Sequence, residues 1–159
     1  MENMSGICFF VPGNPKGLKR HRTFRTKAGF SVQVDASKAD KADFLALAMA
    51  HRPAEPIREP VTLTAVCVFA RPKSHFRRDG SVKPDAPKWY PSTPDWDNVG
   101  KWIGDALNGT FWHDDRLIVV GKVYAVYGAV PGVAVEIQPP TEIEYQHALS
   151  LVGSVRRNT

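Results

Sequence analysis

The chain has 159 residues, of which 43% are hydrophobic and 23% charged, and its formal net charge is +5. That length allows one domain with a real core but is short for two. No apolar run approaches the ~18 residues that a membrane span requires, and the N-terminal stretch is a poor signal peptide. We therefore expect a cytoplasmic protein without a membrane partner.

Local patterns in the first half of the chain predict both strands and helices. An apolar strand is expected over 5–11, before a turn rich in Pro and Gly, and a second strand over 30–34. Apolar residues at helical spacing predict a helix over 36–51. The β-branched run at 61–69 predicts another strand, and the proline-rich segment 72–94 is expected to be a long irregular loop.

The second half begins with a helix, because Pro94 and Asp95 favour its start and Asn108-Gly109 its end. Strands are expected over 117–127 and 133–137. A short helix over 142–152 and a tail over 156–159 complete the chain. The two cysteines, Cys8 and Cys67, lie in apolar strand-like runs without metal-ligand spacing, so we expect both to be small buried hydrophobic residues.

Charge is distributed unevenly along the chain. There is no acidic residue between Asn3 and Val34, and a second basic stretch covers 71–88. Basic segments with interleaved aromatic residues suit a polyanionic backbone, because each Lys or Arg near a phosphate releases counterions. Solvated basic loops are the alternative interpretation. The candidate DNA-binding residues are Lys16, Lys19, Arg20, Arg22, Arg25, Lys27, Arg71, Lys73, Arg77 and Arg78.

The acidic residues gather between Pro94 and Lys122. Steps of four place Asp97, Lys101 and Asp105 on one face of the expected helix. The Asp114-Asp115 pair follows the turn that closes this helix, so the chain can fold back and bring one of them near Asp95 and Asp97. Carboxylates crowded together repel one another and need a cation. Three of them make a hard oxygen-ligand set suited to Mg²⁺, and Lys101 can reach the same region to stabilise phosphate charge.

Each of these residues also has a purely structural interpretation. Asp97 and Lys101 have the spacing of an ordinary surface ion pair. Asp95 is a favourable helix cap, and Asp114-Asp115 suits a polar turn before a strand. Four of the five histidines show no ligand spacing, and His113 is compatible with a simple loop position. Trp102 and Trp112 are expected in the core.

The run PDWDNVGKWIGDALNGTFWHDDRLIVVGKVYAVYG resembles the RusA-type endodeoxyribonucleases, the Holliday junction resolvases common in phages and prophages. Their pattern reads roughly PDxDNxxKxxxDALNGxxxxDDxxI, followed by a strand with a Lys. The resemblance implies an α+β fold, a small mixed β-sheet with helices packed on one side. It further implies a RusA-like domain over 1–138 and a C-terminal extension over 139–159.

The resemblance also implies roles for particular residues. Asp95, Asp97 and Asp115 would coordinate Mg²⁺, with Mn²⁺ able to substitute, and Lys101 would be needed for catalysis. Asp105 would support Lys101, and Asp114 would either orient the strand that follows it or hold the metal-binding side chains in place without binding the metal itself. The family acts as a homodimer that nicks opposing strands of a four-way junction symmetrically.

This chain departs from the pattern at Trp96 and Val99, where small aliphatic residues, often leucine, are usual. The departures leave the implied metal site intact. Two alternatives stay open: a nuclease of the same fold that acts on other branched or flapped DNA, and a protein that binds branched DNA or junctions with a vestigial metal site.

Overall fold

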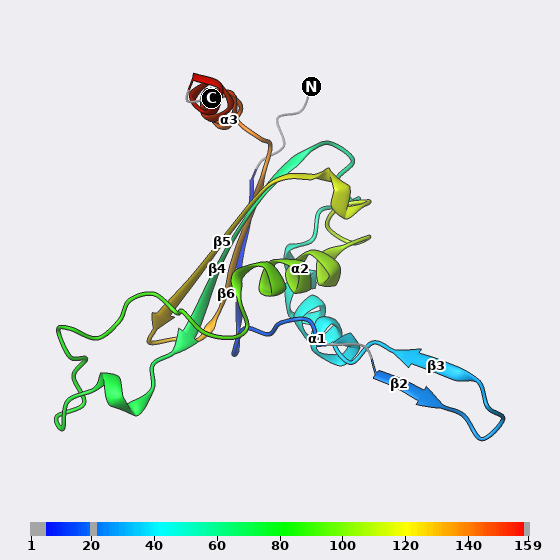
Figure 1. Ribbon diagram of the computed structural model, residues 1–159, viewed down its shortest axis with the longest axis horizontal. Coiled ribbons are helices and arrows are strands. Elements are labelled where there is room, and N and C mark those ends of the chain that lie inside the picture. The colour runs from blue at the N-terminus through cyan, green and yellow to red at the C-terminus, as the bar shows by residue number, and fades with distance from the viewer. Residues whose placement is uncertain (1–5, 20–21, 158–159) are drawn as a thin grey trace.

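The computed structural model describes residues 6–19 and 22–157, and its main element is a four-stranded sheet. The strands are β1 (Ile7–Pro12), β4 (Val61–Ala70), β5 (Ile118–Gly128) and β6 (Gly132–Gln138), in the order β1-β6-β4-β5. Strands β4 and β5 are parallel, and the other neighbours are antiparallel. The sheet is therefore mixed, as the resemblance implies (Figure 1).

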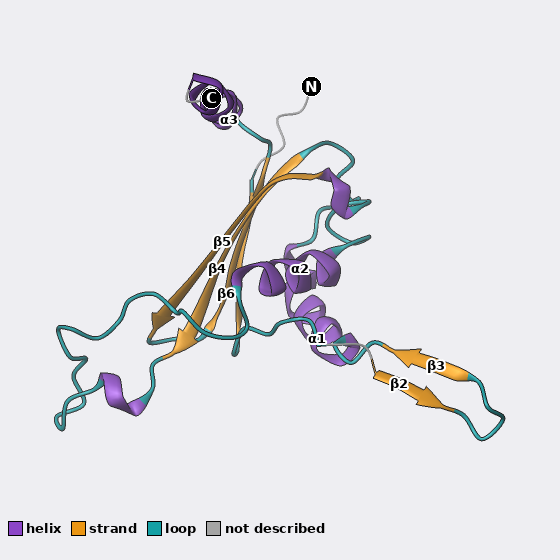
Figure 2. Ribbon diagram, in the orientation of Figure 1, coloured by secondary structure: helices purple, strands orange, loops and turns teal. Residues whose placement is uncertain are grey.

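Two helices lie against one face of this sheet, so the predicted α+β architecture is confirmed (Figure 2). Helix α1 (Lys38–Ala48) continues into a 3-10 turn (Met49–His51), and α2 (Trp96–Leu107) packs on α1 and β5. Alternate strand residues point toward these helices and form the core with them. The largest fully buried side chains are Trp112, Phe111, Ile103, Leu107, Ile137, Val61 and Val99.

The opposite face of the sheet is not covered by α1 or α2 (Figure 2). Phe10 pairs with Ala134, Ala134 with Val66, and Val66 with Tyr124, so these four side chains form one row across all four strands. Phe10 and Tyr124 are exposed, and Ala134 and Val66 are partly so. A row of apolar side chains thus crosses an open sheet face.

A hairpin projects from the body beyond α1 (Figure 1). It consists of β2 (Arg22–Arg25) and β3 (Ser31–Val34), whose residues are all exposed. Gly29 makes its turn possible: it adopts a φ of +85°, which residues with a Cβ rarely adopt, and its N–H donates to the Thr26 carbonyl at 2.9 Å. Strand β3 was predicted from the sequence, but β2 was not.

The loop between β4 and α2 projects on the other side of the sheet (Figure 1). It is more regular than the sequence predicts, because a 3-10 turn (Lys73–His75) begins it and part of it pairs with the free edge of β5. There, the Tyr90 N–H donates to the Ala125 carbonyl at 3.0 Å, and the Tyr127 N–H donates to the Lys88 carbonyl at 2.9 Å. The Tyr90 ring also stacks on Phe69, with centroids 3.6 Å apart.

The C-terminal helix α3 (Glu142–Arg157) stands apart from the two core helices (Figure 1). Thr141 and Glu144 cap it reciprocally: the Glu144 N–H donates to Thr141 Oγ1 at 3.2 Å, and the Thr141 N–H donates to Glu144 Oε2 at 2.9 Å. Glu144 also accepts from Thr62 Oγ1 at 3.1 Å and pairs with Lys122. One carboxylate therefore both caps the helix and ties it to β4 and β5.

This contact fixes the charge states of both partners. The Lys122 ammonium and the Thr141 amide lower the pKa of Glu144 from 4.5 to about 2, and the Glu144 carboxylate raises the pKa of Lys122. Because the pKa of Glu144 is lowered on folding, the contact stabilises the fold above about pH 4.5 and is lost as the pH falls toward 2. At the alkaline end it is lost as the pH rises through the raised pKa of Lys122.

Three further expectations can be compared with the fold. Trp102 and Trp112 are buried, as predicted. Cys67 is buried as predicted, and burial raises the pKa of its thiol to about 12. Cys8 is exposed, so the predicted burial of this residue is wrong. The Cys8 side chain lies on the open face of the sheet, at the edge strand β1. The C-terminal helix continues to Arg157, so the prediction that a tail starts at residue 156 ends the helix too early.

Candidate active-site groove

Helix α2 presents an acidic and basic face to solvent because its apolar residues face the core. Val99, Trp102 and Ile103 are buried on one side. Asp97, Lys101 and Asp105 follow one another at steps of four on the other side, as the sequence predicts. The helix begins after Asp95, its N-cap, and the chain reverses at Gly109, whose φ is +74°. A short, well-bounded helix therefore fixes the spacing of these charges.

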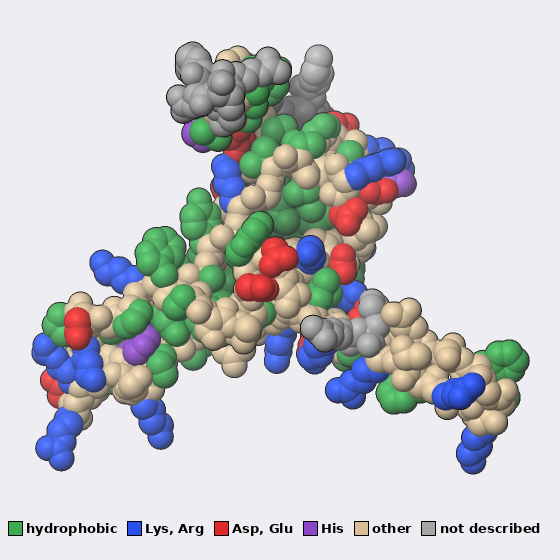
Figure 3. Space-filling view, viewed as in Figure 1, with side chains coloured by type: hydrophobic (Ala, Val, Ile, Leu, Met, Phe, Trp, Pro, Cys, Tyr) green, Lys and Arg blue, Asp and Glu red, His purple; other side chains and the backbone are tan. Residues whose placement is uncertain are grey.

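Asp115 reaches the same region from another element. It begins a 3-10 turn (Asp115–Leu117) that leads directly into β5. Asp115, Asp97, Lys101 and Asp105 all line one groove of about 350 Å³ between α2 and β5. Figure 3 shows acidic and basic side chains side by side on this part of the surface. The parallel pairing of β5 with β4 thus brings residues of the two predicted carboxylate clusters to a common groove.

Asp114 has a local role. Its Oδ1 accepts from the Arg116 N–H at 3.0 Å and caps the turn that begins at Asp115, and its Oδ2 lies 3.6 Å from the Arg116 guanidinium. These contacts hold the backbone at the point where β5 begins. They agree with the expectation that Asp114 orients the strand.

Two lysines pair with aspartates that line the groove. Lys101 Nζ donates to Asp97 Oδ2 at 3.0 Å, and this hydrogen bond is the main reason that the pKa of Asp97 lies below its ordinary value. Asp97 is therefore an ionised carboxylate at neutral pH. Lys41 of α1 lies 3.7 Å from Asp105 Oδ2 and 2.7 Å from Asp35 Oδ2. Asp105 therefore pairs with Lys41 of the neighbouring helix, and its implied support of Lys101 stays a prediction.

The donor chemistry of the groove fits a hard divalent cation only in part. Mg²⁺ is commonly held by one or two carboxylates, with water and substrate phosphate completing its shell, and Asp97 and Asp115 supply two. Asp95, the third expected ligand, is an exposed N-cap outside the residues that line the groove. Within residues 6–19 and 22–157, no three Asp, Glu, His or Cys side chains are grouped closely enough to hold a metal ion.

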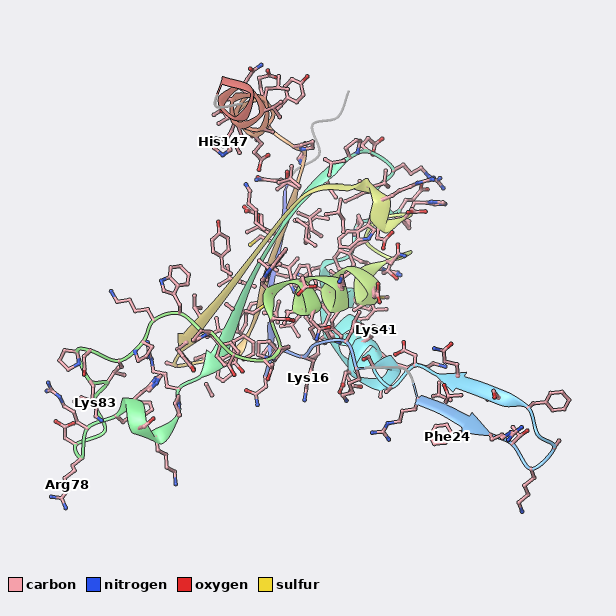
Figure 4. All side chains as sticks on the ribbon, viewed as in Figure 1. Lys16, Phe24, Lys41, Arg78, Lys83 and His147 are labelled. Carbon is pink, nitrogen blue, oxygen red and sulfur yellow. The ribbon has the colours of Figure 1, made fainter. Side chains whose placement is uncertain are left out.

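The basic loop that follows β1 crosses the start of α2. A Cβ at Gly17 would lie 2.7 Å from Pro94 Cβ and 2.8 Å from Asn98 Nδ2, so only glycine allows this approach. Lys19, two residues on, is held by Asp40 of α1 at 2.5 Å, whereas Lys16 is exposed (Figure 4). The loop therefore carries a free lysine past the N-terminal end of the helix that bears Asp97.

The candidate DNA-binding residues fall on this loop and on the two projections. Arg22, Arg25 and Lys27 are exposed on the β2–β3 hairpin, and Lys73, Arg77 and Arg78 on the loop after β4. Figure 4 shows Arg78 and Lys83 near the outer end of that loop. Arg71 instead donates to the Pro87 carbonyl at 2.7 Å and lies over the Tyr127 ring, so it holds the loop together. Arg20 lies outside the described residues.

Sequence reasoning missed two contacts of this region, although the family pattern includes a Lys on the strand after the Asp pair, which is the position of Lys122. Lys41 was assigned no partner, although it joins α1 to Asp105 across the helix pair. Lys122 lines the groove and pairs with Glu144, 22 positions further along. Neither contact follows a helical or strand spacing. Both depend on how separate elements pack, so no local signal identifies them.

An acidic groove between basic projections is the arrangement of an enzyme that acts on the phosphodiester backbone of nucleic acid. Residues 12–138 match the sequence model of the family described as "Endodeoxyribonuclease RusA", so the chain belongs to the RusA family. It is accordingly an endodeoxyribonuclease of the Holliday junction resolvase type, with branched DNA as its substrate.

A second comparison concerns a bacterial relative. The chain is 32% identical to "Uncharacterized protein YqaN" of Bacillus subtilis (strain 168) over 139 residues, which cover 85% of this chain and 97% of that protein. The family match ends at Gln138, the last residue of β6, so α3 follows the matched region. Across the described ranges, no helix is long and apolar enough to cross a membrane.

Proposed function

We propose that this RusA-family enzyme resolves four-way DNA junctions in a Mg²⁺-dependent reaction that makes paired, symmetrical nicks. The observation that carries the proposal is the groove, where Asp97, Asp115 and Lys101 meet between two projections rich in exposed Lys and Arg. Water attacks the scissile phosphate and leaves 5′-phosphate and 3′-hydroxyl ends that a ligase can seal.

Asp97 and Asp115, joined by the neighbouring Asp95, are the carboxylates to which we assign the ion. A bound divalent cation lowers the pKa of a water molecule and neutralises charge on the scissile phosphate, and Mn²⁺ is expected to substitute for Mg²⁺. The protein contributes ionised oxygen donors at fixed positions. Helix α2 fixes Asp97, the turn before β5 fixes Asp115, and the hydrogen bond from Lys101 holds the Asp97 carboxylate in place.

Lys101 is assigned to the reacting phosphate itself. An ammonium group has three N–H donors, and Asp97 accepts one of them at 3.0 Å. The others remain for a phosphate oxygen in the same groove. A fixed positive charge at this place stabilises the negative charge that builds up on phosphorus in the transition state.

The hairpin and the loop after β4 are assigned to the arms of the junction. They extend in different directions from the groove, and their basic side chains are exposed at the ends (Figure 3). Duplex DNA can be bound through its phosphates without regard to sequence. The exposed Lys and Arg side chains of the two projections can therefore bind the phosphates of different junction arms at the same time.

A second copy of the chain is the partner that symmetrical nicking requires. The open sheet face offers a surface for it, since Phe10, Val66 and Tyr124 form an uncovered apolar row, and a two-fold contact uses the same patch on both copies. We expect multi-angle light scattering to give twice the mass of one chain, and Tyr124→Glu to give the mass of one. A wild-type mass of one chain at working concentration would contradict the dimer.

The test of the function compares a mobile four-way junction with linear duplex of the same sequences. Paired nicks in the junction alone, present with Mg²⁺ and absent with EDTA, are expected. Equal cutting of both substrates would contradict a junction resolvase, and cutting of flaps or forks in preference to the junction would favour a nuclease for other branched DNA.

The family match makes the chain a nuclease, and the alternative of a protein that only binds branched DNA or junctions with a vestigial metal site has a distinct signature. That function predicts tight junction binding that weakens steeply with salt, with the DNA left intact in both Mg²⁺ and Mn²⁺. The same assay therefore separates the two.

A further inference from the structure

Trp96, the first residue of α2, is the largest apolar side chain beside the groove that the proposed chemistry leaves without a role. It is 67% exposed, although Trp102 from the same helix is 3% exposed in the core. It stands between Asp95 and Asp97 in the chain and lines the groove with Asp97, Lys101 and Asp115. Its indole therefore contributes little to the core and lies next to the carboxylates.

Two glycines form the α2 side of the groove next to Trp96. Gly100 and Gly104 follow Trp96 at steps of four, so the three residues share one face of α2, and both glycines line the groove. Across from them lie the apolar side chains of Leu63, Ile118 and Val123. A Cβ at Gly100 would already lie 3.1 Å from Val123 Cγ2. The groove is thus a narrow apolar space with an indole at one end and carboxylates along its rim.

A nucleobase is the partner whose chemistry matches this combination. It is a flat aromatic group covalently attached to the phosphate backbone on which the neighbouring carboxylates act. Consecutive Cα atoms lie only ~3.8 Å apart, so an indole at Trp96 lies within one nucleotide of a phosphate at Asp97. Stacking of a base on an aromatic side chain is independent of base identity, because every base has a π face. The volume of about 350 Å³ is within the range of small-molecule pockets.

We propose that Trp96 stacks on a base adjacent to the scissile phosphate and thereby helps the enzyme select branched DNA. The inference rests on the proposed function, since it places the scissile phosphate at Asp97. In linear duplex both faces of each base are covered by its neighbours. At a branch point a base loses a stacking neighbour, so it can swing toward the indole at a lower unstacking cost. Trp96 is thus a specificity residue, separate from the groups that act on phosphorus.

The test measures contact and selectivity separately. Junctions carry 5-iododeoxyuridine at the nucleotides that flank the mapped nick, are bound with EDTA present, and are irradiated. We expect a crosslinked peptide that contains Trp96. Trp96→Leu, which restores an aliphatic residue at this position, should lower junction affinity roughly tenfold or more and leave duplex affinity unchanged, while Trp96→Phe keeps most of it.

Tyr145→Leu is the matched control, because Tyr145 is 59% exposed but lies on α3, outside the residues that line the groove and outside both basic projections. Its variant should keep the affinity and the Trp96 crosslink. Wild-type junction affinity in Trp96→Leu, without a crosslink at Trp96, would overturn the inference. A wild type that binds junctions but never nicks them overturns the proposed function instead, and the crosslink still reports on Trp96.

Discussion

Asp97→Asn is expected to lower the rate of junction cutting at least about a hundredfold while junction binding is kept or tightened. Asparagine has nearly the shape of aspartate, so α2 and its buried stripe are undisturbed. The change removes the carboxylate charge that pairs with Lys101, and with it the donor to which we assign the cation. Binding improves because one negative charge that repels the DNA phosphates is lost from the groove.

The measurement is the single-turnover rate of nicking in Mg²⁺, with the dissociation constant of the uncut junction measured in EDTA. Asp43→Asn makes the same charge change on α1, outside the groove, and should cut as wild type does. If Asp97→Asn nicks junctions as fast as the wild type, the assignment of this groove as the catalytic site is wrong. A variant that neither binds nor cuts would show a loss of fold, which thermal unfolding detects.

The sequence predicts much of this fold because its elements have strong local signals. The run at 61–69 is rich in β-branched residues, and the observed strand is Val61–Ala70. The α2 region has a buried stripe, a start at Asp95 and a glycine stop at Gly109, and it forms a helix within those bounds. Where several local preferences agree with one another and with the tertiary packing, the observed element matches the one predicted from the sequence.

The β2–β3 hairpin shows where such signals fail. Its strands are four residues long and exposed on both faces. Strand β2 reads Arg-Thr-Phe-Arg and lacks the alternation of apolar and polar residues that marks a half-buried strand, whereas β3 alternates and was predicted. The sequence-based prediction of the loop after β4 fails for another reason. Its prolines suggest irregular structure, but the segment around Tyr90 pairs with a strand edge that lies more than thirty residues further along the chain. Such pairing depends on tertiary structure.

The residues of the candidate site also divide into those that the sequence could place and those that it could not. Helical spacing alone places Asp97, Lys101 and Asp105 on one face, and the structure agrees. The approach of Asp115 depends on the parallel pairing of β4 with β5, and spacing could only suggest it. The sequence could not predict that Asp95 lies outside the groove lining, because the direction of an N-cap side chain is set by the loop that precedes the helix.

The second large effect concerns the β2–β3 hairpin and its positive charges. The triple variant Arg22→Gln, Arg25→Gln and Lys27→Gln should weaken junction binding on the order of a hundredfold in ~0.1 M salt. All three side chains are exposed, so their loss leaves the core intact. If each contacts one duplex phosphate, the slope of log K against log salt becomes shallower by about 2.7, since each contact contributes about 0.9.

The slope distinguishes this mechanism from a general loss of positive charge. Arg52→Gln with Arg58→Gln removes two exposed charges from the segment between α1 and β4, away from both projections, and should change the slope little. The rate of nicking at saturating protein should stay near the wild-type value in the triple variant, because the hairpin lies outside the groove residues. An unchanged slope in the triple variant would mean that the hairpin does not contact DNA phosphates. In that case any contact of the hairpin with DNA would be uncharged, and the exposed Phe24 and Phe30 are the side chains to test next.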